Sequence, residues 1–206
     1  EQTGTSGTYI KDSSGNGRNS TSISGTTFIQ GKIGKARDFS GTDVVHFGNI
    51  LNGLGTTGFT ADVWVKTTTT VLGTPIVGKY WSTGSSFVIR TDGTTAGKIG
   101  FTTMNGASST NDSVSVKSVN DGNWHHIVGV LIPNVRQYLY IDGVLEDSDA
   151  ATTGTWTDNH YVCIGRFCDT ADTASGTVFT GSIDEVRISN IPRSADEIRQ
   201  AFEVGK

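Results

Sequence analysis

Short segments in which apolar and polar residues alternate recur along most of the chain, and they constrain its fold more than any other feature. Such alternation is typical of strands that bury one face. The segments are Val44–Phe47, Phe59–Val65, Phe87–Ile89, Lys98–Thr102, Ser113–Val116, His125–Leu131, Gln137–Ile141, Val162–Gly165 and Gly181–Ile188. Asp-Gly pairs, which favour hairpin turns, stand between or beside them at positions 92, 121 and 142. The pattern predicts an all-β protein in which two antiparallel sheets pack face to face.

One short helix is expected near the end of the sequence. Ser194 followed by Glu197 three residues later forms a capping box, which marks a helix N-terminus. Ile198 and Phe202 stand four residues apart, so both lie on one face of that helix. We expect this face to pack against the sheets.

Size and glycine content agree with a single β domain. A chain of 206 residues is within the range of one all-β sandwich, and 27 glycines against 3 prolines suit many tight turns. We expect residues 1–8 to be a linker or tail and residues 9–206 to form the domain. With neither an initiator Met nor a signal peptide, the sequence is interpreted as a mature or excised part of a longer secreted or cell-surface protein.

The charge pattern excludes two classes of partner. There are 16 basic and 20 acidic residues and no basic cluster, which argues against nucleic-acid binding. No apolar run approaches the roughly 20 residues that a membrane-spanning helix needs. Only 17% of residues are charged, so the polar surface depends on Ser, Thr, Asn and Gly, which suit neutral, hydroxyl-rich ligands.

Two cysteines occur, Cys163 and Cys168, with four residues between them. In a secreted protein they can form a local disulfide. The alternative is a buried Cys163 and an unrelated loop thiol at Cys168. A zinc site is disfavoured, because the sequence has no second Cys pair or His pair at ligand spacing.

Seven phrases of the sequence, taken in order, resemble one family. They are DSSGNG (Asp12–Gly17), GKIGKARDFSG (Gly31–Gly41), FTADVWVK (Phe59–Lys66), DGNWHHIVGV (Asp121–Val130), LYIDGVL (Leu139–Leu145), GSIDEVRISN (Gly181–Asn190) and RSADEIRQ (Arg193–Gln200). Together they resemble the laminin-G-like jelly-roll domains of the concanavalin A-like lectin and glucanase superfamily, from Tyr9 onward. The resemblance implies a two-sheet antiparallel jelly-roll sandwich with one short C-terminal helix.

The resemblance also implies one structural calcium ion. Related domains place their first loop beside their last strand, so Asp12 and Asn16 of DSSGNG would share the ion with Asp184 of SIDEVR. Calcium takes six to eight oxygen ligands, which short carboxylates and carbonyls of a tight loop supply. The alternative is that Asp12 and Asn16 form Asx turns and that Asp184 caps a backbone amide.

The aromatic residues divide into core and loop positions. Trp64 and Trp124 lie in strand segments and are expected in the core. His125 and His126 would point to opposite faces of one strand, one packed and one solvated, so they cannot hold a metal together. The remaining rings lie in polar loops with groups that can bond sugar hydroxyls, and these form the candidate ligand site: Tyr80, Trp81, Arg90, Trp156, Asp158, Asn159, His160 and Tyr161. The alternative is that Trp81 and Trp156 only cover the ends of the sandwich.

An enzymatic function is not expected. Retaining glycoside hydrolysis needs two carboxyl groups about 5 to 5.5 Å apart, and the E-x-D-x-x-E string of hydrolases with this fold is absent. Glu185, Glu197 and Glu203 lie in the last strand and helix, and Glu146 with Asp147 and Asp149 is interpreted as a solvated acidic turn. No other catalytic motif is present.

The sequence therefore predicts a non-catalytic carbohydrate-binding or adhesion module, with a glycan and the other domains of its parent protein as partners. A structural or protein-interaction domain of a surface or viral assembly is the alternative, and a glycoside hydrolase of the same fold is a third possibility. Fold resemblance by itself does not decide among them.

Overall fold

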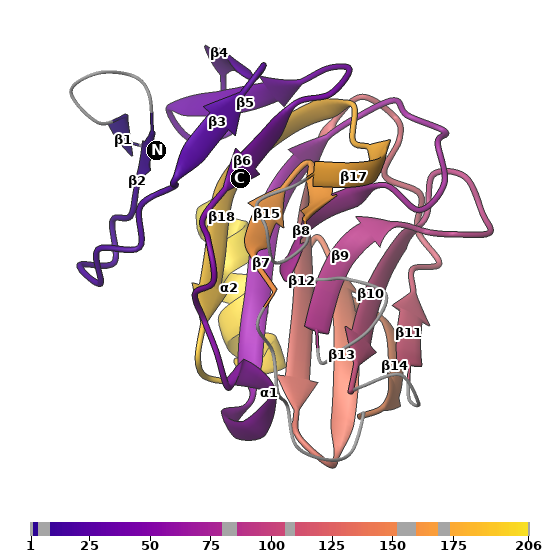
Figure 1. The fold of residues 1–206 in the computed structure, drawn as a ribbon. Coiled ribbons are helices and arrows are strands. Elements are labelled where there is room, and N and C mark those ends of the chain that lie inside the picture. Colours follow the sequence, from indigo (N-terminus) through magenta and orange to yellow (C-terminus); the bar gives the residue numbers. More distant parts are fainter. Residues whose placement is uncertain are drawn as a thin grey trace.

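Two antiparallel sheets of seven strands each form the body of the protein (Figure 1). The computed structural model describes residues 2–3, 9–79, 86–105, 110–151, 160–168 and 174–205. Sheet I has the order β11-β10-β9-β8-β15-β6-β3, and sheet II has the order β14-β13-β12-β7-β18-β5-β4. This architecture confirms the predicted jelly-roll sandwich.

Sheet I consists of β11 (Thr110–Val114), β10 (Ile99–Met104), β9 (Ser86–Thr91), β8 (Pro75–Lys79), β15 (Val162–Ile164), β6 (Val44–His46) and β3 (Ser22–Ser24). Sheet II consists of β14 (Val144–Ala150), β13 (Arg136–Ile141), β12 (Trp124–Ile132), β7 (Phe59–Lys66), β18 (Gly181–Ser189), β5 (Lys35–Phe39) and β4 (Thr27–Gln30). Two further pairs are β1 (Gln2–Thr3) with β2 (Ile10–Lys11), and β16 (Arg166–Cys168) with β17 (Ala174–Val178). The helices are α1 (Leu54–Thr57) and α2 (Ala195–Val204).

The core lies between the two sheets. Because side chains alternate along a strand, every second residue of each central strand points inward. Phe59 of β7 meets the ring of Phe87 at 4.7 Å and that of Phe101 at 6.2 Å between centroids, so the two sheets interlock through these rings. Gly129 of β12 makes room for this packing, because a Cβ there would lie 2.4 Å from the Phe101 ring.

Helix α2 packs on the outer face of sheet II, where Figure 1 draws it in yellow beside β18 and β7. Ser194 and Glu197 form the predicted capping box. Ile198 is 1% exposed and packs with Val128, Val130 and Tyr140. Phe202 stacks on Trp64, with the ring centroids 5.8 Å apart. The predicted helix and its packing face are confirmed.

The structure confirms one expectation about buried residues and corrects two. Trp64 is buried, as expected, and it lies under α2 rather than in the cluster between the sheets. Trp124, the first residue of β12, is only half-buried, so it is not a core residue. His125 and His126 do point to opposite faces, yet both are buried, at 5% and 2% exposure, so neither is solvated.

The acidic segment with Glu146, Asp147 and Asp149 is strand rather than turn. It lies in β14, which pairs with β13 through the hairpin at Asp142-Gly143. Both turn residues have positive φ, 52° and 77°, as the type I′ turn requires.

Candidate functional site

The predicted ligand site falls largely on residues that the structure does not describe. Tyr80, Trp81, Trp156, Asp158 and Asn159 all lie outside the described residues. The strands that flank them are described, and they are neighbours in sheet I. Lys79, directly before Tyr80, pairs with Val162, directly after Tyr161. The strand residues that adjoin the two aromatic segments in the sequence are therefore paired in sheet I.

A buried lysine holds this end of sheet I together. Lys79 is 1% exposed. Its ammonium group donates to Asn49 Oδ1 at 3.0 Å, to the Ile50 carbonyl at 2.6 Å and to Asn52 Oδ1. A buried ammonium needs several acceptors to offset the loss of water. These bonds fix the segment before α1 against the last residue of β8.

The structure describes three residues of the predicted ligand site: His160, Tyr161 and Arg90. Only Tyr161 both lies at this end of sheet I and keeps exposed surface. His160 is 5% exposed. Tyr161 is half-buried and packs against the cluster of Val44, Cys163 and Cys168. Arg90 lies at the other end of β9, four residues from Ser86 and therefore about 13 Å along the strand.

Arg90 is engaged in a polar cluster of its own. Its Nη2 forms an ion pair with Asp112 Oδ2, and its Nε donates to Thr102 Oγ1 at 2.9 Å. Burial raises the pKa of the Asp112 carboxyl, although the positive charge of Arg90 opposes this. The cluster links β9, β10 and β11, so the contacts of Arg90 indicate a role in structure.

The large cleft of the described residues lies elsewhere, along β18 and α2. It has a volume of about 1270 Å³. One wall comes from the N-terminal segment, including Asp12 and Asn16, and another from β18 between Glu185 and Ile188. Residues of α2, among them Glu197 and Gln200, complete it. Residues of the first loop and of the last strand thus line the same cleft.

Asp12, Asn16 and Asp184 can be tested as calcium ligands from their present contacts. Asp12 accepts bonds from the amides of Ser14 and Arg18, both at 2.9 Å, and from the Ser14 hydroxyl. The Ser14 hydroxyl bond is the main cause of a lowered pKa of Asp12, which keeps this carboxylate ionised. Asn16 donates through Nδ2 to Ser14 Oγ, so its amide oxygen is directed elsewhere. The donor set consists of oxygens and fits a hard cation.

Asp184 is the more constrained of the two carboxylates. It is 0% exposed. Its Oδ2 accepts from the Ile33 amide and its Oδ1 from the Glu185 amide, both at 2.9 Å. A Cβ at Gly31 would lie 2.4 Å from Asp184 Oδ2, so only glycine fits there. These contacts match the alternative in which Asp184 caps backbone amides, and Asp184 is not among the residues that line the cleft.

A cluster of polar residues that the sequence did not predict, Asp62, His126 and Arg187, also lines this cleft. Asp62 of β7 forms a two-point ion pair with Arg187 of β18, at 3.0 and 3.1 Å. His126 Nε2 lies 3.6 Å from Asp62 Oδ1. The His126 ring stacks on Trp64, whose other neighbours include Lys32, 4.6 Å from the ring centroid. Trp64 is therefore covered and cannot stack on a sugar.

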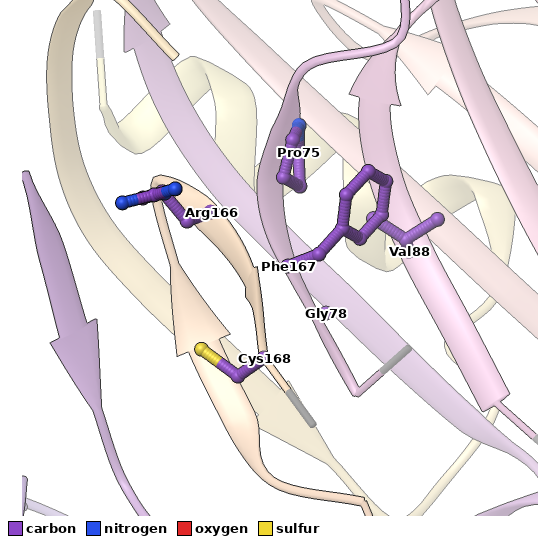
Figure 2. A pocket seen from close by; sticks show the side chains of 6 residues that line it. All are labelled: Pro75, Gly78, Val88, Arg166, Phe167 and Cys168. Carbon is purple, nitrogen blue, oxygen red and sulfur yellow. The ribbon is translucent and has the colours of Figure 1, made fainter. Parts of the chain in front are cut away.

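The outer face of sheet I is covered by the β16–β17 hairpin. Cys168 lines a small pocket together with Pro75, Gly78, Val88, Arg166 and Phe167. Figure 2 shows the Phe167 ring beside Val88, and the side chains of Arg166 and Cys168 turned away from that ring. Val88 is 0% exposed. The hairpin thus closes this part of the sheet to ligands.

Cys163 and Cys168 form a disulfide that ties the hairpin to sheet I. His46 of β6 lies beside it, with Nδ1 3.4 Å from each sulfur. His46 is separated from the two cysteines by 117 and 122 residues, so no spacing pattern in the sequence indicates this cluster. It is the one group of three or more His, Cys, Asp or Glu residues at metal-ligand distances in the described part of the chain.

Comparison with known proteins agrees with the fold. The family model described as the concanavalin A-like lectin/glucanases superfamily matches residues 39–199. No curated protein matches the sequence. None of the helices in the described residues is long and apolar enough to cross a membrane.

Solved structures with the same fold include binding domains of toxins and of an enzyme. The binding domain of Paraclostridial Mosquitocidal Protein 1 is similar with a TM-score of 0.75 and 16% identity, over 95% of this chain and 49% of that chain. For the botulinum neurotoxin serotype G binding domain the TM-score is 0.71 and the identity 16%, over 94% of this chain and 48% of that chain. This chain thus spans about half the length of the two toxin domains.

The third similar structure is matched over most of its length. It is domain 4 of AbnA, a GH43 extracellular arabinanase from Geobacillus stearothermophilus, in complex with arabinotriose. Its TM-score is 0.68 at 20% identity, over 85% of this chain and 80% of that chain. At these identities all three likenesses show the fold.

Proposed function

This chain belongs to the concanavalin A-like lectin/glucanases superfamily, and we propose that it is a non-catalytic carbohydrate-binding module of a larger secreted or cell-surface protein. The observation that carries the proposal is the pairing of Lys79 with Val162. In the sequence these two paired residues adjoin two aromatic-rich stretches, Tyr80-Trp81 and Trp156–Tyr161. Aromatic rings next to hydrogen-bonding groups suit sugar rings, which have apolar faces and hydroxyl edges.

The similar structures support a ligand of this class. The arabinanase domain was solved with arabinotriose, and a further structure of this fold concerns cell entry of botulinum neurotoxin type C, which depends on two ganglioside molecules. The Cys163–Cys168 disulfide supports a secreted or cell-surface location, because disulfides persist in oxidising compartments.

The contacts of the described acidic residues support a role without catalysis. Glu197 caps α2, and Glu146 and Asp147 accept bonds from backbone amides of the opposite sheet. Asp112, whose pKa is raised, is held by Arg90 and Thr102. A glycosidase needs two carboxyl groups at a cleft. Of the acidic residues that line the cleft along β18, Asp12 accepts from backbone amides, Asp62 pairs with Arg187 and Glu197 caps α2.

A glycan array with purified protein tests the proposal. We expect specific binding that falls at least about tenfold, or 1.4 kcal/mol, in Trp81→Ala and in Trp156→Ala. Phe28→Ala is the matched control, because Phe28 is an aromatic residue on β4 of sheet II with 39% exposure. Its binding should equal that of the wild type.

Other outcomes of the array would reject specific parts of the proposal. If none of the diverse glycans on the array binds, the alternative function as a protein-interaction domain is favoured. Binding that survives both tryptophan substitutions would place the ligand elsewhere, with the cleft along β18 as the next candidate. Turnover on a panel of polysaccharides would identify a hydrolase.

We also propose a structural calcium ion held by Asp12, Asn16 and Asp184, as the family resemblance implies. The oxygen donors of these three residues support it. Such an ion would stabilise the fold by joining two distant parts of the chain, and it would take no part in a reaction.

A further inference from the structure

His46, Cys163 and Cys168 form a compact, buried cluster. Cys163 of β15 pairs directly with His46 of β6, and Cys168 follows on β16. The three residues are 5%, 2% and 1% exposed. Their ligand atoms all lie within 4.8 Å of one another. Two thiol groups and one imidazole are the set that zinc and other thiophilic ions prefer.

The spacing of these atoms agrees with a tetrahedral zinc centre in all but one distance. Zn–S bonds of about 2.3 Å and Zn–N bonds of about 2.0 to 2.1 Å place nitrogen about 3.5 Å from each sulfur and the sulfurs about 3.8 Å apart. His46 Nδ1 already lies 3.4 Å from both sulfurs. Only the two bonded sulfurs would have to separate.

We propose that reduction of the Cys163–Cys168 disulfide creates a zinc site formed by His46, Cys163 and Cys168, with water as the fourth ligand. A phosphine gives two electrons to the disulfide, whose S–S bond breaks, and becomes the phosphine oxide. One water molecule supplies the oxygen of that oxide and the two protons of the resulting thiols. Zinc then displaces both thiol protons and binds two thiolates and the neutral imidazole. In the disulfide form the sulfurs are bonded to one another, and the site is absent.

Charge balance favours such a site in a buried position. Two thiolates neutralise the two positive charges of zinc, so the filled site has no net charge to desolvate. Val44 and Tyr161 pack around the sulfurs and form an apolar wall. None of the three zinc ligands belongs to the proposed carbohydrate site, and the two sites share only Tyr161, which packs against the sulfurs.

Zinc titration of the oxidised and the phosphine-reduced protein tests the proposal. We expect the reduced protein to bind one equivalent of zinc and the oxidised protein to bind none. Cobalt in place of zinc should give the absorption bands of a tetrahedral, sulfur-ligated ion. Zinc should also raise the melting temperature of the reduced protein.

Variants assign the ligands. His46→Ala should weaken zinc binding by more than about 100-fold, because even the loss of an outer partner of a ligand costs 10- to 100-fold. His125→Gln, in sheet II, is the matched control and should bind as the wild type does. Three results would each overturn the proposal: a folded, reduced protein that binds no zinc, equal affinity in His46→Ala, or a reduced protein that zinc leaves unfolded.

Discussion

His125 is the residue through which pH should act on the stability of the fold. Its Nδ1 lies 2.8 Å from Asp142 Oδ2, and its Nε2 lies 3.1 Å from Asp121 Oδ1. The bond to Asp142 is the main cause of a raised pKa of His125. Burial alone would raise the pKa of Asp142, but the bonds from His125 and Lys117 outweigh it and lower that pKa to about 2.

The stabilising effect of this cluster should be greatest between about pH 4 and 6.5. Because the folded pKa of His125 is raised, its contribution is complete below the unfolded value of about 6.5 and is lost as the pH rises through the folded value. The contribution of Asp142 is lost as the pH falls from 3.8 towards about 2. Urea unfolding from pH 5 to 8 should therefore show a falling free energy of unfolding, and His125→Gln should flatten the profile.

Substitution of the acids separates their effects. Asp142→Asn should remove most of the pH dependence, because the bond to Asp142 is the larger cause of the raised pKa of His125. Asp121→Asn should remove only part of the pH dependence. A pH profile that is the same in His125→Gln as in the wild type would contradict this account.

At the scale of elements, acidic side chains of β14 cap the backbone of the facing edge strand β11 and of the residues that directly follow it. Asp147 Oδ2 accepts from the Val114 amide at 2.8 Å. Glu146 Oε2 accepts from the amides of Val116 and Lys117, at 2.9 and 2.6 Å. These bonds run from the edge of sheet II to the edge of sheet I, and they satisfy donors that would otherwise be unpaired.

Removal of both acids should loosen this edge. For the double variant Glu146→Ala with Asp147→Ala we expect the free energy of unfolding to fall by about 1–2 kcal/mol. Three charged hydrogen bonds in a site without water would contribute more, but water screens the bonds of Glu146. Hydrogen exchange at the amides of Val114, Val116 and Lys117 should become faster. The Gln and Asn versions keep an acceptor oxygen and should change less. Unaltered exchange in the double alanine variant would rule out the capping role.

The sequence predicted half of the strands and helix α2 because those segments obey local rules, but it missed others, among them β5 and the central β8. Each strand segment read from alternation corresponds to a strand, from β6 (Val44–His46) to β18 (Gly181–Ser189). Strand β14 was missed because Glu146, Asp147 and Asp149 interrupt the apolar pattern, and the partner that accounts for them belongs to the other sheet. Helix α2 was predicted because its capping box is local.

At the scale of the whole molecule, the proposed calcium ion should affect thermal stability. A chelator should lower the melting temperature, since an ion at 100 times its dissociation constant contributes about 2.7 kcal/mol. The response should disappear in Asp12→Asn and in Asp184→Asn. If the melting temperature is unchanged and elemental analysis finds no metal, the ion proposed here is absent and amide capping accounts for both aspartates.

The candidate site was predictable only where its residues lie close in sequence. The sequence placed Asp12 and Asn16 in one oxygen-rich loop, and the cleft contains both. It had no means to foresee that His46 lies beside Cys163 and Cys168, or that Asp62 pairs with Arg187 across 125 residues. Those contacts depend on which strands become neighbours, and alternation does not encode strand order.

The capped edge has a consequence for many copies of this domain crowded together on one surface. Open strand edges act as templates on which a neighbouring chain can continue the sheet. Here the amides of Val114, Val116 and Lys117 already have acceptors within the same molecule. Adjacent copies that touch along this side find these donors already occupied, so close crowding need not lead to aggregation there.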